Sequence, residues 1–371
     1  MRNGLYVAAG FVIIHGLIHL IGFTAYWPLA EIAELPYKTN LLGSRWDVGD
    51  AGMRLFSVLW LAATVGLVAA VVGILTGKQW WFPIMGTAVL LSLVACVLDW
   101  DNAFRGAIID LAILVPLLLV GGLRIQPQPF AAYPQESKAL TAVPLPADLP
   151  APVARYYEAI MGDAVLAMET AVITARGQLR FAGITFPARL RFTHDAGQGY
   201  RHYIEATIFG RPLLKVNERY LDGQARMQLP MGVIENEPKI DMAANLGLWG
   251  ESIWLPSIFI TDPRVHWQPI NDTAALLIVP FKDGEDTFSA NFAAETGLLV
   301  SMEALRYREA TDVEKIPWRL DILAWDEYQG IRVPSRSSVT WADEGSPWLV
   351  IELDDIVYNV DVRNTIRAEG P

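Results

Sequence analysis

The sequence of 371 residues has little cysteine and no surplus of basic charge, and each shortage excludes a class of site or partner. Its one cysteine, Cys96, can form no intrachain disulfide, and a cysteine-based metal site is excluded. The chain carries 29 basic and 40 acidic residues, a net charge of −11. Phosphate binding needs a field of Lys and Arg, so nucleic acid is not an expected partner. The same deficit argues against electrostatic docking on anionic lipid, so we expect any membrane contact of the soluble part to be apolar.

The chain also lacks complete catalytic motifs. It contains no GxSxG elbow, Walker A loop, GxGxxG turn or HExxH helix. We therefore expect a non-enzymatic protein that needs no cofactor for its main function. His194 and His202 flank the turn at DAGQG and could face each other across a hairpin. Because a pair without a third ligand is a weak metal site, they are predicted to be surface histidines.

Long apolar runs, by contrast, are abundant in the first third. Four runs approach the roughly 20 residues needed to cross a bilayer. They cover residues 5–27, 53–75, 80–100 and 107–123. Trp27, Trp80 and Trp100 lie at run ends, where aromatic side chains favour the membrane interface. These runs predict a multi-pass, four-helix transmembrane domain over residues 1–124, with residues 101–105 as the link between the last two helices.

The basic residues beside these runs predict an orientation. Four crossings place both ends of the domain on one side of the membrane. The loops of the other side hold Lys38, Arg45, Arg54 and Arg105, which flank the runs more tightly than the remaining basic residues. The positive-inside rule therefore favours a bacterial inner membrane protein whose soluble domain is extracytoplasmic.

Three ionisable residues inside the runs are candidate site residues, because burying them in lipid is costly. His15 and His19 are four residues apart and share one helix face, and Asp110 lies in the fourth run. The first interpretation is interhelical hydrogen bonding, with Asp110 as partner of a histidine. The alternative is a membrane redox or metal protein, since a His pair at this spacing can bind zinc or copper. A quinone or haem remains a further alternative. Haem would need another histidine, because its axial ligands approach from opposite faces.

After the helices the composition changes twice. Residues 125–152 hold seven prolines, which predicts a stiff linker over 125–150 that stands the next domain off the membrane. Residues 153–161 follow the helical spacing, and from Ala171 onward apolar and polar residues mostly alternate. One segment, 237–260, again favours short helices. We therefore expect a mainly β domain over 151–365: a curved antiparallel, half-barrel-like sheet with a few covering helices and an apolar cleft beneath them.

Several motifs of this domain resemble an uncharacterised bacterial family of membrane-tethered envelope β domains. The motifs are LPAPVARYY (149–157), ERYLDGQARM (218–227), GESIWLPS (250–257), AETGLLVSMEALRYR (294–308) and YQGIRVPSRSSVTW (328–341). The resemblance covers roughly residues 145–362. It implies a more distant likeness to LolA/LppX-type lipoprotein carriers, whose half-barrel of strands has helices in its mouth.

The resemblance implies a function and a set of cleft residues. The protein is expected to bind or handle a lipid or lipoprotein in the cleft. The candidate cleft residues are Tyr156, Tyr157, Arg219, Tyr220, Trp249, Glu251, Trp254 and Phe259. Possible partners are therefore lipid, lipoprotein or another membrane protein. A further alternative is that the domain serves as an envelope sensor or a protein-interaction platform.

Overall fold

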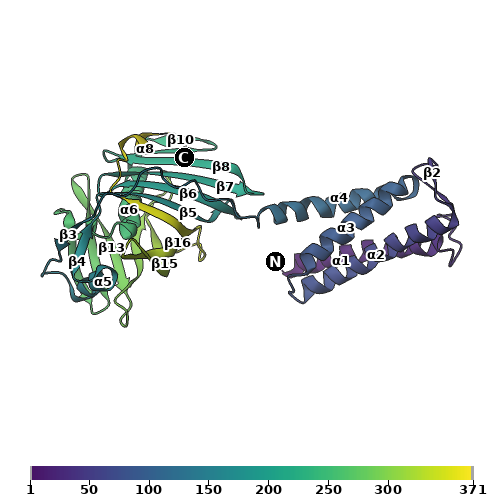
Figure 1. Cartoon of the computed structure of the whole chain (residues 1–371), viewed down its shortest axis with the longest axis horizontal. Coiled ribbons are helices and arrows are strands. Elements are labelled where there is room, and N and C mark those ends of the chain that lie inside the picture. Colours follow the sequence, from purple (N-terminus) through teal and green to yellow (C-terminus); the bar gives the residue numbers. More distant parts are fainter. Residues whose placement is uncertain (1, 369–371) are drawn as a thin grey trace. The chain divides into compact units, whose positions relative to one another are not determined.

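The structure is a computed structural model that describes residues 2–368. The chain forms two compact units that divide between Gly121 and Gly122. The first unit is helical and the second is mainly β (Figure 1).

The helical unit contains four helices that are long and apolar enough to cross a membrane, as predicted. They are α1 (Arg2–Tyr26), α2 (Gly49–Leu75), α3 (Trp81–Leu98) and α4 (Trp100–Gly122). The short strands β1 (Asn40–Leu41) and β2 (Trp46–Asp47) pair between α1 and α2.

Small residues let these helices approach closely. A Cβ added to Gly66 of α2 would lie only 2.7 Å from the Cβ of Ala88 on α3. Gly16 of α1 packs on Leu67, and its carbonyl oxygen accepts a hydrogen bond of 2.9 Å from the Thr64 hydroxyl. Close contacts through small residues are typical of helices that associate within lipid.

The expected link between the last two helices is much shorter in the structure. Only Asp99 separates α3 from α4, so residues 101–105 belong to α4. The Asp99 carbonyl accepts bonds from the backbone N–H groups of Asn102 and Ala103, which starts the new helix. Asp101 in the first turn favours the positive end of the helix dipole. The sequence prediction missed this because hydropathy marks the apolar run, and the polar first turn lies outside it.

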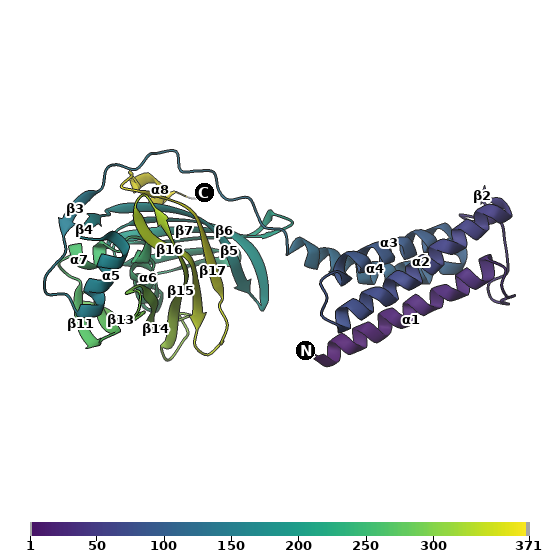
Figure 2. The same cartoon turned by 60° about the horizontal axis from the view of Figure 1, so that its bottom comes forward.

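The β unit is built on one open antiparallel sheet of 13 strands, curved around α6 (Figure 2). The strands are β5 (Thr170–Phe181), β6 (Ile184–Asp195), β7 (Gly199–Ile208), β8 (Arg211–Leu221), β9 (Gln224–Leu229), β10 (Gly232–Glu235), β11 (His266–Asn271), β12 (Ala274–Phe281), β13 (Gly284–Phe292), β14 (Leu299–Arg306), β15 (Ile316–Tyr328), β16 (Ile331–Trp341) and β17 (Leu349–Tyr358). The predicted curved antiparallel sheet is thereby confirmed.

The strand order explains how one chain makes so wide a sheet. Two meanders, β5 to β10 and β11 to β17, are joined where the last strand β17 pairs with the first strand β5. Each meander joins neighbours by short turns, so alternating sequence and local pairing suffice to build it. The pairing of β5 with β17 is different, because it joins strands that are far apart in the sequence.

The concave face of the sheet is covered by helices. They are α5 (Ala151–Met161), α6 (Pro238–Glu251), the 3₁₀ turn η1 (Ser252–Trp254) and α7 (Ile258–Thr261). The pair β3 (Thr141–Pro144) and β4 (Ala164–Ala167) flanks α5, and α8 (Arg363–Arg367) follows the last strand. Helices were predicted at 153–161 and within 237–260, and both predictions are confirmed.

The proline-rich segment packs on the β unit and does not stand free as the expected spacer. Phe130 is buried, with the Arg189 guanidinium 4.5 Å from its ring centre. The Arg191 guanidinium donates to the carbonyl of Ala131. Further along, the Ser137 hydroxyl accepts the backbone N–H of Tyr358 at 2.9 Å. Proline composition predicts an extended backbone. It does not predict that the Phe130 side chain packs on the sheet and holds the segment there.

Candidate functional site

The helical unit contains a buried polar cluster built from three helices. His15 of α1 lies 2.8 Å from Asp110 of α4, measured from Nε2 to Oδ1. The Ser92 hydroxyl of α3 also donates to the Asp110 carboxylate, with oxygen–oxygen distances of 2.6 and 2.8 Å. His19 joins the cluster through a 2.5 Å contact from its Nε2 to Ser92 Oγ. The sequence-based prediction that Asp110 bonds a histidine thus agrees with the geometry.

The donors and acceptors in this cluster define the state of His19. A serine hydroxyl has one hydrogen, and Ser92 donates it to Asp110. Its oxygen must then accept the hydrogen of His19 Nε2. In a neutral imidazole the other nitrogen, Nδ1, is therefore a bare acceptor. This atom is buried and has no hydrogen-bond partner among the described residues.

A second polar cluster lies at one end of the same helices. The Asp99 carboxylate accepts hydrogen bonds from Lys38 Nζ at 2.5 Å, from Asn102 at 2.9 Å and from the Tyr26 hydroxyl. Ser92 and Asp99 are seven residues apart on α3, so they share one face about two turns, or about 10 Å, apart. The two clusters form a polar line along the inside of the bundle.

A cavity of about 720 Å³ follows this polar line. It is lined by His15 and His19 of α1, Trp60 of α2, Cys96 of α3 and Asp99, and by apolar residues of α1 and of the loop that follows it. The charged residues Glu34, Asp101 and Arg105 complete the lining at the end where α4 begins. Among the lining residues, Ile18, Ile21 and Phe104 are exposed on the outer surface of the bundle. The cavity therefore reaches both the apolar outer surface of the bundle and the exposed polar residues where α4 begins.

The same cluster has the donor set of a metal site. Ligand atoms of His15, His19 and Asp110 all lie within 4.8 Å of one another. Two imidazoles and a carboxylate suit zinc, copper or iron. A metal ion would take the place of the hydrogen bonds through Ser92. His15 and His19 are the only histidines before residue 194, so the unit offers no histidine from a second helix as an axial ligand to a haem.

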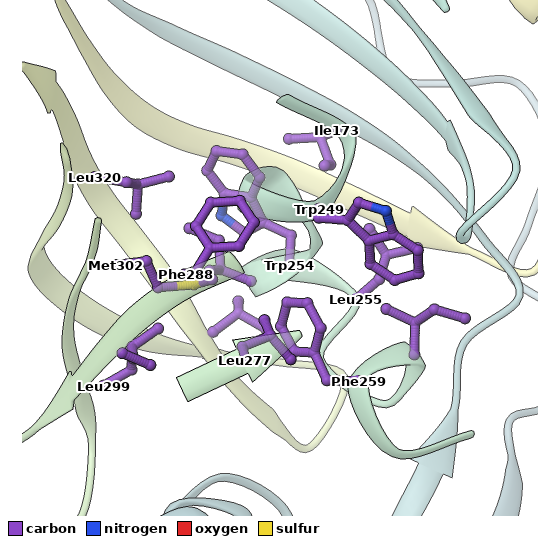
Figure 3. Packing of buried hydrophobic residues seen from close by; sticks show 14 of the residues in the cluster. Ile173, Trp249, Trp254, Leu255, Phe259, Leu277, Phe288, Leu299, Met302 and Leu320 are labelled. Carbon is purple, nitrogen blue, oxygen red and sulfur yellow. The ribbon is translucent and has the colours of Figure 1, made fainter. Parts of the chain in front are cut away.

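The concave face of the sheet differs from the expected open cleft. Five of its candidate aromatic residues are at most 2% exposed and belong to the main hydrophobic core. They are Tyr156, Tyr157, Trp249, Trp254 and Phe259. Figure 3 shows three of them, Trp249, Trp254 and Phe259, among apolar side chains of the strands. Their hydroxyl and indole groups are partly tied to backbone: Tyr157 donates to Pro256 O at 2.7 Å and Trp254 to Pro334 O at 2.9 Å. The segment from α6 to α7 is long enough to fill the face, which the sequence prediction underestimated.

The polar cleft candidates lie elsewhere. Tyr220 of β8 is buried under α6, where its hydroxyl donates to Asn245 at 3.3 Å. Arg219 lies beside a polar surface depression of about 280 Å³ with Asp222 and Arg226. Glu251 lies at the end of α6. Its partners are two histidines.

His194, His202 and Glu251 form a buried clamp between the sheet and the end of α6. The Glu251 Oε2 atom lies 3.0 Å from His194 Nε2 and 2.5 Å from His202 Nε2. Glu218 lies behind His202, 3.6 Å from its Nδ1, and accepts a bond from the Tyr200 hydroxyl. The prediction of surface histidines is wrong, because the third partner comes from a helix 49 residues away in sequence.

The three groups of the clamp have pKa values shifted far from their ordinary ones. Burial alone would lower the pKa of His202, but the Glu251 and Glu218 carboxylates outweigh it and raise that pKa to about 9. Burial would raise the pKa of Glu251, yet the two histidines lower it to about 2. Burial lowers the pKa of His194, which is therefore the neutral member.

The charges of this clamp balance without a metal ion. Protonated His202 balances Glu251, and it also lowers the pKa of the nearby Glu218 carboxyl despite burial. The positive charge of the Arg306 guanidinium adds to this lowering. Ligand atoms of His194, His202 and Glu251 do lie within 4.8 Å of one another. A divalent ion here would have to displace the proton that His202 holds between the two carboxylates. The arrangement is better suited to holding α6 on the sheet than to binding a metal.

The chain was compared with curated proteins, with solved structures and with protein families. No curated protein matches the chain. Three solved structures are similar to it at low identity. A LolA superfamily protein from Nitrosomonas europaea is 11% identical, over 59% of this chain and 96% of that one, with a TM-score of 0.37. A putative outer membrane lipoprotein-sorting protein domain from Vibrio parahaemolyticus is 10% identical, over 58% and 92%, with a TM-score of 0.33. A DUF1329 family protein from Desulfovibrio piger is 12% identical, over 53% and 89%, with a TM-score of 0.33.

One family matches the sequence itself. The model of DUF6544, described as a family of unknown function, matches residues 138–353. The match spans more than half of the chain and includes all five motifs from which a family was expected. The protein therefore belongs to the DUF6544 family.

Proposed function

We propose that the protein is a membrane-anchored envelope protein that binds a lipid-like amphiphile, and that the cavity of the helical bundle is the binding site. One observation carries this proposal: a cavity of about 720 Å³, which reaches the apolar outer surface of the bundle, is lined by a buried histidine that lacks one hydrogen-bond partner among the described residues. Large, mostly apolar pockets with a few convergent polar groups are the usual form of a small-molecule site.

The polar end of the cavity selects the headgroup. His19 Nδ1 is an acceptor when the ring is neutral, so its missing partner is a donor. A hydroxyl supplies one, which suits a glycerolipid, an isoprenoid alcohol or a quinol. The chain of such an amphiphile would lie along Ile18 and Ile21, which line the cavity near its opening. Each buried CH₂ group contributes about 0.8 kcal/mol.

The concave face of the sheet supports lipid binding less well. An acyl chain would reach it only if the α6–α7 segment moved. Three polar contacts hold that segment on the sheet. Glu251 bonds to two histidines, the Asn245 amide donates a hydrogen bond of 3.0 Å to Asp286, and Asp241 forms an ion pair of 3.0 Å with Lys282. Opening would expose these groups together with two tryptophans. We therefore propose lipid handling at the bundle, with the β domain as the rigid part that partners contact.

The test is lipid analysis of the full-length protein. Wild type and His19→Phe would be purified in detergent, extracted with organic solvent and examined by mass spectrometry and ultraviolet absorbance. We expect a near-stoichiometric amphiphile in wild type, several-fold depleted in His19→Phe and retained in His266→Ala, whose histidine is exposed on the β unit. Mass and absorbance separate a quinol from a glycerolipid. Identical, bulk-like lipid in all three samples would refute the proposal.

A metal at His15, His19 and Asp110 is the second candidate, because their ligand atoms converge. Elemental analysis and a visible spectrum of the same preparation address it. A stoichiometric metal or a Soret band that disappears in a His15→Ala/His19→Ala double variant would support this candidate. A colourless and metal-free wild-type protein, still metal-free after incubation with zinc, would exclude it.

A further inference from the structure

Within the β5–β10 meander, the turns at one end of the strands carry exposed apolar side chains. The β5–β6 hairpin presents Phe181 and Ile184, and the β7–β8 hairpin presents Phe209 and Leu213, each about half exposed. The β9–β10 turn is directed the same way along the sheet and carries Met231, which is 82% exposed. Water-facing turns are ordinarily polar, so a row of such residues marks an interaction surface.

The opposite ends of these same strands have a different composition. The β6–β7 turn contains Asp195 and Gln198, and the β8–β9 turn contains Asp222 and Gly223. None of the large apolar side chains exposed in the described part of the chain lies in these two turns. The asymmetry therefore belongs to one end of the strands, and the polar end provides an internal control.

The apolar tips also contain no acidic residue, although the protein as a whole is acidic. Residues 179–190 and 206–217 contain no Asp or Glu, although the chain has a net charge of −11. They contain Arg180, Arg189, Arg211 and Lys215. Arg180 and Arg189 pair with glutamates, whereas Lys215 is mostly exposed and lies 3.7 Å from its acidic neighbour. Apolar side chains among basic ones are typical of segments that lie in a lipid headgroup layer.

The chain itself indicates which surface these tips meet. The turn at Gly210 packs on the segment that enters the β unit: a Cβ added there would lie 3.7 Å from Ile125 Cγ2 and 3.8 Å from Gln126 O. Ile125 follows the last residue of α4, Gly122, by three positions, which extend over about 10 Å at most. Because α4 is apolar enough to span a bilayer, this tether favours a lipid surface over a soluble partner.

We propose that the β5–β6 and β7–β8 hairpin tips insert into the headgroup region of the membrane that holds the helices. The proposal rests on the membrane anchoring proposed above. Insertion at two neighbouring tips would fix this end of the sheet against the bilayer and leave the polar turns facing water.

The test uses single cysteines in the full-length Cys96→Ser protein, reconstituted in liposomes of phosphatidylcholine and phosphatidylglycerol. An environment-sensitive dye is attached at Phe209→Cys, Ile184→Cys or Gln198→Cys, and at Val65→Cys on the exposed face of α2. Spin-labelled lipids with the quencher near the headgroup then report contact of the tips with lipid, and lipids with the quencher deep in the acyl chain report contact at position 65, near the middle of α2. We expect blue-shifted, quenched emission at positions 209 and 184, and unshifted, unquenched emission at 198.

Two results would overturn the inference, and they are distinguishable. If the dye at 65 is quenched while those at 209 and 184 behave like 198, the helices are in the membrane and the tips are not. If the dye at 65 is also unquenched, the membrane anchoring itself fails and the tip insertion falls with it.

Discussion

His15 and Asp110 lie 2.8 Å apart, from Nε2 to Oδ1, although 95 residues separate them in the sequence. Both side chains are almost fully buried, and Asp110 accepts a further hydrogen bond from Ser92. A carboxylate with two donors from two other helices ties α1, α3 and α4 together. In a lipid environment such polar contacts stabilise helix association.

This geometry predicts that Asp110→Ala destabilises the bundle by about 2 kcal/mol, since interhelical polar contacts contribute about 1–2 kcal/mol each. A thiol-reactive fluorogenic dye can follow unfolding, because Cys96 is the single cysteine and is buried in the same unit. Ser57→Ala is the control, since Ser57 is buried but bonds only to Arg54 O of its own helix. Equal thermal midpoints for the two variants would contradict the prediction.

The joint between the two meanders gives the second prediction. Gly177 of β5 faces Val350 of β17 so closely that an added Cβ would lie 1.9 Å from the Val350 carbonyl oxygen. We expect Gly177→Ala to push these strands apart and cost several kcal/mol, or to abolish folding. Gly284→Ala is the matched control, because its nearest neighbour, the Phe281 oxygen, would be 3.7 Å away. Soluble yield and urea unfolding measure both. Similar stability of the two variants would show that the strands can separate freely.

Much of the architecture could be predicted because it follows from local patterns. Apolar runs of near-bilayer length predicted the four helices, and period-two alternation predicted the meandering strands. The boundary at α4 was missed, since its first turn is polar. The packing of Phe130 on Arg189 was also missed, because composition describes backbone stiffness and not where a side chain binds.

The sites were less predictable, because they depend on contacts between distant segments. His15, His19 and Asp110 were identifiable, since ionisable residues are rare in apolar runs. The clamp was not, because nothing near His194 and His202 in sequence identifies Glu251 as their partner. Cleft residues were chosen for aromatic character, which serves a filled core equally well. The proposed membrane-facing hairpin tips had a signal in the sequence. Residues 179–190 and 206–217 contain no Asp or Glu, in contrast to the acidic remainder of the domain.

The filled concave face leads to the third prediction. Trp254 is buried beneath the sheet, and both its indole N–H and its carbonyl oxygen are hydrogen-bonded. Trp254→Ala should lower the free energy of unfolding by about 3–5 kcal/mol, the usual cost of emptying a tryptophan site. Leu323→Ala on an exposed strand position should change it by less than about 0.5 kcal/mol. Urea unfolding followed by tryptophan fluorescence compares them. A small effect at Trp254 would indicate that the face is an adaptable cavity after all, which would return the lipid site to the sheet.

The clamp predicts a specific dependence of stability on pH. His202 has a pKa of about 9 in the folded protein against an ordinary 6.5, so its stabilisation is complete below pH 6.5 and is lost as the pH rises through 9. Glu251, with a pKa of about 2 against 4.5, stabilises above pH 4.5 and loses this effect as the pH falls through 2. His194 has a lowered pKa, so it opposes folding increasingly as the pH falls below 6.5. The clamp should therefore stabilise the β unit most near pH 6.5.

Thermal unfolding of the full-length protein across this range tests the dependence. Raising the pH from 6.5 to 9 should remove stabilisation on the order of 3 kcal/mol in wild type, at 1.36 kcal/mol for each unit of the pKa shift. His202→Gln removes the titrating ring, so its unfolding should change little over the same range. His266→Gln, an exposed histidine outside the clamp, should behave like wild type. If the alkaline loss persists in His202→Gln, another group causes it, and the Glu251 carboxylate does not hold His202 in its charged form.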